Sequence, residues 1–148
     1  MADTRVQVEV ERWIRENWLP RIFRQGFRQR QLDLTSGGKF VFDGVSEDGR
    51  VVVTVSTSGA RTAGGKHGSG KLQKIRADAL FLLLSGAQQP VLMFSEQDMF
   101  DLCRKEAEHG RLPRNLRFEL AEIPVELRAR LQQARLVSAL EVSPRRAV

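Results

Sequence analysis

Cross-linking and metal-binding residues are scarce in this sequence. It contains one cysteine, Cys103, two histidines and no tyrosine. A single cysteine excludes both an internal disulfide and a multi-cysteine zinc site, and it makes a reducing, cytoplasmic location the expected one. The two histidines, His67 and His109, stand too far apart in the sequence to predict a zinc site. No apolar run approaches the length that crosses a bilayer, and the opening MADTRVQVEV lacks the apolar core of a signal peptide, so no membrane association is expected.

The overall composition is that of a globular protein with an excess of positive charge. Hydrophobic residues make up 41% of the 148 positions and charged residues 28%, which is ordinary for a folded domain. We expect one domain over residues 1–148, with a mobile tail from about residue 142. The formal net charge of +6 favours a polyanionic partner or an acidic protein partner.

Hydrophobic spacing predicts nine elements in the order α-β-β-β-α-β-α-β-α. The first is a helix from Thr4, as N-cap, to Leu19, ended by Pro20. The other predicted elements cover about Phe27–Thr35, Lys39–Ser46, Arg50–Thr57, Lys71–Leu84, Pro90–Ser95, Ser95–His109, Asn115–Ile123 and Pro124–Leu140. Strands followed by strand–helix alternation indicate an α/β fold with a mixed sheet flanked by helices. The second half of the helix at Lys71–Leu84, ALFLLL, is apolar nearly all round and is expected to be buried.

The dipeptide Asp48-Gly49 predicts a tight turn between the second and third strands. A type I′ turn with these two residues at its centre fixes the register of the hairpin. Val45 is then expected opposite Val52, and Asp43 opposite Thr54. Simple alternation also places Val45 on the same face as Asp43, away from the phenylalanines of that strand.

This order of elements, with an aspartate on the second strand that faces the third, resembles the restriction-endonuclease-like, or PD-(D/E)xK, nuclease superfamily. The resemblance covers roughly Val6–Leu120. It implies an α-β-β-β-α-β core in which Asp43 and a third-strand carboxylate bind Mg²⁺, while a lysine two residues later activates the attacking water. Thr54 and Ser56 stand at those third-strand positions. The resemblance therefore implies a nucleic-acid-binding protein, with DNA the favoured partner, that has lost catalysis.

A relocated active site is the first alternative. Some members of the superfamily carry these residues on the helix that follows, and here Lys74 and Asp78 lie at helical i,i+4 spacing on it. Asp43 and Asp78 would then be the ligands of Mg²⁺ or Mn²⁺, and Lys71 or Lys74 the catalytic cation. Glu9, Glu11 or Glu16 of the first helix would assist them. The competing interpretation of Lys74 and Asp78 is an ordinary surface ion pair.

A glycine-rich basic loop precedes the same helix. Gly65–Lys71 satisfies G-x-x-x-x-G-K, but Leu72 replaces the hydroxyl residue that would hold Mg²⁺, so the loop predicts phosphate contact and no nucleotide hydrolysis. The residues expected to contact nucleic acid are Arg28, Arg30, Lys39, Arg61, Lys66, His67, Lys71 and Lys74. The second alternative is a protein-interaction subunit of a larger assembly, or a homodimer, and no cofactor is expected unless the enzyme alternative holds.

Overall fold

Five strands form one open mixed sheet in the computed structural model of the chain, which describes residues 4–61 and 69–142. Their order across the sheet is the order of the sequence. The strands are β1 (Phe27–Asp33), β2 (Lys39–Ser46), β3 (Val51–Ser56), β4 (Gln89–Phe94) and β5 (Arg117–Leu120). β1, β2 and β3 pair antiparallel, whereas β3, β4 and β5 pair parallel. The predicted α/β class with a mixed sheet is confirmed.

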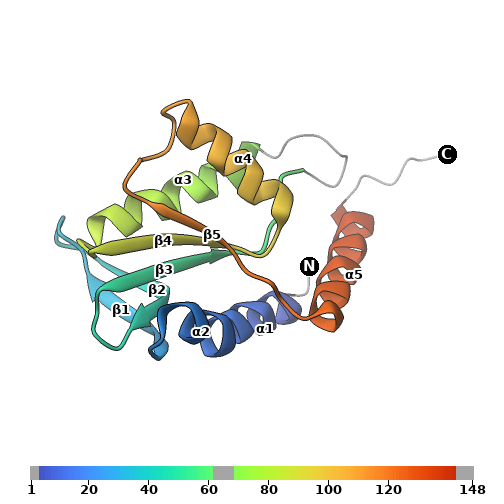
Figure 1. Ribbon diagram of the computed structural model, residues 1–148. Coiled ribbons are helices and arrows are strands. Elements are labelled where there is room, and N and C mark those ends of the chain that lie inside the picture. Colours follow the sequence, from blue (N-terminus) through green and yellow to red (C-terminus); the bar gives the residue numbers. More distant parts are fainter. Residues whose placement is uncertain (1–3, 62–68, 143–148) are drawn as a thin grey trace.

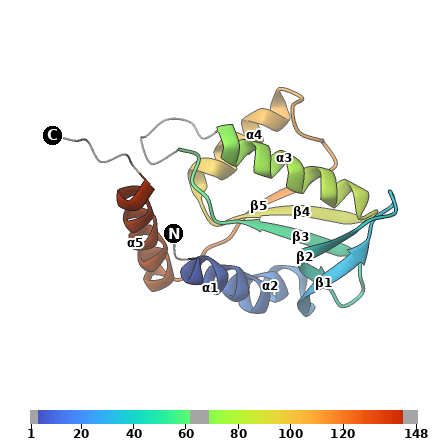
Figure 2. The same cartoon turned by 180° about the vertical axis from the view of Figure 1, so that it is seen from behind.

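Helices cover both faces of this sheet. They are α1 (Arg5–Trp13), a π-helical turn η1 (Ile14–Trp18), α2 (Leu19–Phe23), α3 (Ser69–Leu84), α4 (Gln97–Glu108) and α5 (Val125–Val142). Figure 1 shows α3 and α4 on one face and α1 and α2 on the other, with α5 beside α1. The reverse view shows the same layers (Figure 2). None of the helices in the described part of the chain has the length and apolar character needed to cross a membrane.

The sheet separates two hydrophobic cores. Val53 and Val55 of β3 pack toward α1 and α5, whereas Val52 packs toward α3 and α4. Alternate side chains of a strand point to opposite faces, so a strand covered on both sides needs apolar residues at every position. This explains why β3 and β4 appear in the sequence as unbroken apolar runs.

The first helix extends past its predicted end. Pro20 was expected to stop it, but the helix passes through η1 and ends only at Phe23. Pro20 lies in the first turn of α2, where its missing N–H costs least, and Arg24 closes the helix with a left-handed φ of 58°. Thr4 is the N-cap residue as predicted, but its side chain makes no capping hydrogen bond. Ser95, the predicted start of α4, instead donates its hydroxyl to Glu96 Oε2 at 2.8 Å.

The hairpin between β2 and β3 has the predicted register with a different turn. Val45 pairs with Val52 as expected. Gly49 has a positive φ of 73°, but Asp48 does not, so the turn is not type I′. The Asp48 carboxylate instead accepts the backbone N–H of Arg50 at 3.0 Å, which holds the turn locally.

A β-bulge interrupts β2. The register pairs on either side of it are Arg28↔Val45 and Arg30↔Phe42. Between these pairs β1 contributes Gln29 alone, while β2 contributes Asp43 and Gly44. The extra residue reverses the alternation, so Val45 joins the same core as Phe42, which corrects the predicted facing. A Cβ on Gly44 would stand 3.0 Å from a methyl carbon of Leu19, so the backbone approaches the α2 layer closely here.

The apolar second half of α3 is buried on one side only. Ile75, Ala79 and Leu82 belong to the α3–α4 core. Leu80 is 53% exposed and Leu83 is 36% exposed, so the predicted burial of the whole ALFLLL segment is wrong. Figure 1 shows α3 lying along one face of the sheet with α4 next to it.

A buried carboxylate fastens α5 to the ends of β3 and β4. Glu96 accepts hydrogen bonds from Arg135 Nη1 at 2.7 Å and Arg128 Nη1 at 3.2 Å. Arg135 also donates to the carbonyl of Thr57, and Arg128 to that of Ser95. Burial alone would raise the pKa of Glu96, but the hydrogen bonds and charges of these partners outweigh burial and hold the pKa below its usual value.

We expect Glu96→Ala to lower the free energy of unfolding by about 2–4 kcal/mol, because two arginines lose their shared anion in a poorly solvated site. Urea unfolding followed by circular dichroism measures the loss. Glu9→Ala is the matched control, since Glu9 joins Arg130 of the same helix by two bonds of 2.7 Å at an exposed position. Equal effects of the two substitutions would contradict a special role for the buried carboxylate.

Candidate functional site at the fork between β2 and β3

The central strands β2 and β3 separate beside Asp43. Their register comprises the pairs Gly44↔Val53 and Val45↔Val52. Beyond these pairs β3 continues along β4, while β2 continues along β1. Asp43 is the first β2 residue past the last pair, and its Oδ2 accepts the backbone N–H of Val55 at 2.7 Å. We call the opening between β2 and β3 beside Asp43 the fork. The bulge therefore places the Asp43 carboxylate inside the fork, where its bond to the Val55 N–H replaces a hydrogen bond of the β-ladder.

Side chains from both helical layers approach this carboxylate. From the α1 side, Arg15 Nη1 donates to the Asp43 carbonyl at 3.2 Å, and Glu11 lies one helical turn before Arg15. From the α3 side, Lys74 Nζ bonds Asp78 Oδ2 at 3.1 Å. The structure thus brings together the predicted Asp43, Lys74 and Asp78. Arg15 was not predicted, although its i,i+4 spacing from Glu11 was the available signal.

The α1 acids named from the sequence have different positions. Glu9 is an exposed partner of Arg130, and Glu16 is also exposed. Glu11 is half-buried and interacts electrostatically with Asp43, Arg15 and Lys74. Burial, reinforced by the Asp43 charge, raises the pKa of Glu11 to about 7 against the pull of the two cations. Glu11 is therefore the α1 acid that belongs to the fork.

Two further carboxyl groups share this environment. Burial raises the pKa of Asp43, and the Val55 N–H, Lys74 and Arg15 oppose the shift. Burial also raises the pKa of Asp78, which Lys74 opposes and the Asp43 charge reinforces. The Asp43 charge thus disfavours ionisation of both Glu11 and Asp78.

The fit of a divalent metal to the fork is partial. Mg²⁺ and Mn²⁺ need several oxygen ligands. Among residues 4–61 and 69–142, no group of three or more His, Cys, Asp or Glu side chains is placed to hold a metal ion. One oxygen of Asp43 is engaged by Val55, and Asp78 is engaged by Lys74. As they stand, Asp43 and Asp78 offer two carboxylates beside a lysine.

The Thr54 hydroxyl lies next to the fork without a partner. Thr54 is 3% exposed, and its Oγ1 makes no hydrogen bond within the part of the chain that the structure describes. Asp43 and Thr54, which were expected opposite each other, are not a register pair, and the Asp43 carboxylate accepts the N–H of Val55. Since Val52 packs toward α3, alternation places Thr54 on that same face. A buried oxygen is thus left available on the side of Lys74 and Asp78.

The predicted basic residues fall into two groups. Arg28, Arg30 and Lys39 are exposed on the outer hairpin of β1 and β2, and the two arginines flank the position opposite the bulge. Lys39 pairs with Asp33 at 2.9 Å. Lys71 lies at the start of α3 and donates to the Arg61 carbonyl at 2.7 Å. The two other predicted contact residues, Lys66 and His67, lie outside the described residues.

Comparisons with protein-family models, curated proteins and solved structures found no match to this chain. Functional conclusions therefore depend on the geometry of its own residues.

The raised pKa of Glu11 makes a pH-dependent prediction. A carboxyl whose pKa is higher in the folded than in the unfolded state contributes stability at low pH and loses it as pH rises, here between about 4.5 and 7. Glu11→Gln removes the charge, so we expect it to raise the free energy of unfolding by about 1–3 kcal/mol at pH 8 and to change it little at pH 5.

Urea unfolding at the two pH values measures this difference. Glu16→Gln is the matched control, because it removes an exposed acid from the same helix and should act alike at both pH values. If Glu11→Gln changes the free energy of unfolding equally at pH 5 and pH 8, the pKa of Glu11 is not raised by its surroundings in the fork.

Proposed function

We propose that this chain binds nucleic acid, with DNA the favoured partner, on a restriction-endonuclease-like core that lacks the usual third-strand catalytic pair. The observation that carries the proposal is the position of Asp43, which a bulge holds at the β2–β3 fork between α1 and α3. The α-β-β-β-α-β order and the mixed sheet support the same core. Thr54 and Ser56 supply neutral hydroxyls where the superfamily resemblance calls for a carboxylate and a lysine.

The cations around the fork are suited to phosphates. Arg28 and Arg30 are exposed on the outer strand, and neither makes an ion pair with a carboxylate in the described part of the chain. Guanidinium groups bind phosphate oxygens through paired N–H donors. The Lys74 side chain is 70% exposed although it bonds Asp78, so its outer surface remains open to a phosphate. A polyanion that crosses the β1 edge would therefore run past the fork.

We expect the affinity for duplex DNA to fall steeply with salt, because phosphate binding releases counterions. Removing two phosphate contacts in Arg28→Gln/Arg30→Gln should reduce the slope of log affinity against log salt by about two units. Fluorescence anisotropy of a labelled duplex at several salt concentrations measures both quantities.

The matched control is Arg50→Gln/Lys105→Gln, which removes the same charge at the far end of β3 and on α4. It should leave the slope close to that of the wild type. Salt-independent binding, or an equal loss of slope in both double variants, would overturn the proposed surface.

A second candidate function is metal-dependent cleavage of nucleic acid with relocated residues. The convergence of Glu11, Asp43, Lys74 and Asp78 favours it, because the side chains expected from a relocated site do meet at the fork. Mg²⁺ or Mn²⁺ would be held by Asp43 and Asp78, and Lys74 would be the cation beside them. The partial fit of the ligand set keeps this function second to binding.

This candidate predicts cleavage of single- or double-stranded DNA or RNA that requires Mg²⁺ or Mn²⁺. Asp43→Ala and Lys74→Met should each abolish the cleavage, while Asp33→Asn, a change in an exposed acid of β1, should not. Gel electrophoresis of labelled substrates measures the products. Cleavage that survives Asp43→Ala would belong to a contaminant, and no cleavage under any of these conditions leaves binding as the function.

A further inference from the structure

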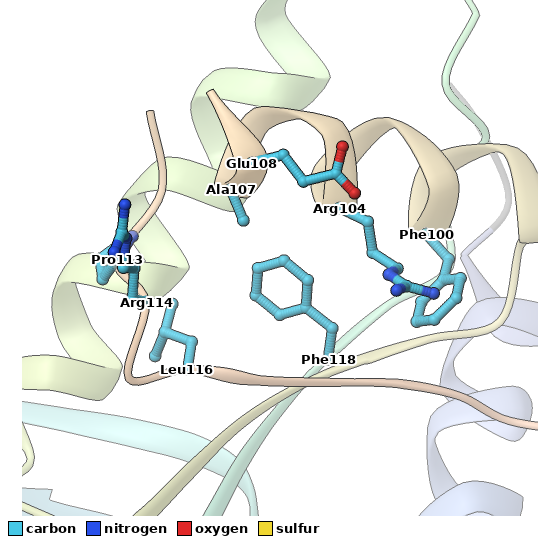
Figure 3. Close-up of a pocket in the computed structure, with 8 residues that line it drawn as sticks. All are labelled: Phe100, Arg104, Ala107, Glu108, Pro113, Arg114, Leu116 and Phe118. Carbon is cyan, nitrogen blue, oxygen red and sulfur yellow. The ribbon is translucent and has the colours of Figure 1, made fainter. Parts of the chain in front are cut away.

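A cavity of about 340 Å³ lies between α4 and the segment that leads into β5 (Figure 3). The fork lies toward the β1 side of the sheet, whereas β5 is the outer strand on the opposite side. The cavity lining consists of Phe100, Arg104, Ala107, Glu108, Pro113, Arg114, Leu116 and Phe118. In size it matches pockets that hold small organic molecules.

Two aromatic rings form the apolar part of the cavity. Phe118 projects from β5 into its centre, and Phe100 borders it from α4. Both rings pack edge-on against the fully buried Phe94, with ring centroids 6.2 Å and 5.9 Å apart. Because Phe94 fixes them from behind, the rings present half-buried surfaces that are already in place for a planar group.

Two arginines without carboxylate partners stand on either side of these rings. Arg76 and Arg111, which lie nearby, both pair with the buried Glu106. By contrast, Arg104 lies over the Phe100 ring at 5.6 Å, and neither Arg104 nor Arg114 makes an ion pair among residues 4–61 and 69–142. Figure 3 shows Arg114 at the end of the cavity away from Phe100. The rim therefore carries two arginines and Glu108, a net positive charge, beside an aromatic floor.

We propose that this cavity binds a nucleotide, with the base against Phe118 and the phosphate held by Arg104, while Arg114 adds positive charge at the other end of the cavity. Base–aromatic stacking and arginine–phosphate pairing are the interactions that this lining supplies. Glu108, the one acid on the rim, suits a base that carries an amino group as hydrogen-bond donor. Other anions that carry an aromatic ring have the same chemistry. We choose a nucleotide because the proposed function is nucleic-acid binding, so this inference rests on the proposed function. The bound nucleotide is either a free mononucleotide or the phosphorylated end of a single-stranded nucleic acid.

Calorimetric titration of the full chain with 5′-AMP tests the site. Arg104→Gln should weaken binding about tenfold, the effect of one charged hydrogen bond, and Arg104→Gln/Arg114→Gln should weaken it further. Phe118→Leu keeps an apolar side chain but removes the ring, and it should weaken binding similarly. Adenosine and ribose 5-phosphate each lack one half of the ligand and should bind at least about tenfold more weakly than 5′-AMP.

Arg12→Gln is the matched control, because it removes an exposed arginine of α1, on the opposite face of the sheet and outside both proposed sites, and it should leave 5′-AMP binding unchanged. Undetectable binding of 5′-AMP, or wild-type binding in Arg104→Gln/Arg114→Gln, would overturn the nucleotide site even if duplex DNA still binds. Conversely, loss of duplex binding with 5′-AMP binding retained would overturn only the proposed surface at the fork.

Competition distinguishes the two nucleotide sources. If the site binds strand ends, a 5′-phosphorylated oligonucleotide should displace 5′-AMP, and the dephosphorylated oligonucleotide should do so at least about tenfold less well. If the site binds free mononucleotides, neither oligonucleotide should compete. Displacement by both oligonucleotides alike would contradict recognition of a phosphate beside the base.

Discussion

The hydrogen bond from the Val55 N–H to the Asp43 carboxylate allows the two central strands to separate without leaving a buried donor unpaired. Where β2 turns away toward β1, the side chain of its own bulged residue takes the place of the missing ladder bond. The opening that results is lined on one side by α1 and on the other by α3. Without this bond, a fork in the middle of the sheet would cost the desolvation of a backbone group.

The bond also explains the electrostatics of the fork. Its hydrogen bond to the backbone holds the Asp43 carboxylate in place, so this carboxylate cannot turn toward solvent. Nearby acids must therefore ionise close to a negative charge whose position is fixed. Glu11 and Asp78 both experience it, from opposite sides of the sheet. Arg15 and Lys74 moderate the repulsion, each from the same helix as the acid it accompanies. The fork is thus a balanced set of charges in which a change at one residue alters the proton affinity of the others.

Much of the fold could be predicted because it depends on local pattern. The order of helices and strands along the chain and the Val45–Val52 register follow from hydrophobic spacing and one short turn. The bulge at Asp43 could not be predicted, since one extra residue leaves no local signature and arises from pairing with β1. The continuation of the helix through Pro20 was missed for a similar reason, because the π-turn before it changes which N–H groups need a partner.

The site residues were predictable in kind more than in arrangement. Asp43, Lys74 and Asp78 could be named because a strand aspartate and a helical acid–base pair are recognisable in sequence. To choose Glu11 over the neighbouring acids of the first helix, one must know which side of that helix faces the sheet. Arg15 binds a backbone carbonyl, and such a contact depends on how two layers pack. The types of residue at the fork are therefore predictable from the local sequence. The electrostatic interactions among them depend on how the helices pack on the sheet.

Gly44 sets the spacing between those layers. A Cβ there would meet a methyl carbon of Leu19 at 3.0 Å, closer than ordinary contact, and would touch Phe27 at 3.4 Å. Any larger residue would act as a wedge between the sheet and the helical segment that carries Glu11 and Arg15. A wedge of a few tenths of an ångström would relax the repulsion between Glu11 and Asp43 and stretch the Arg15 bond. The ionisation of Glu11 and Asp43 therefore depends in part on the absence of a side chain at Gly44.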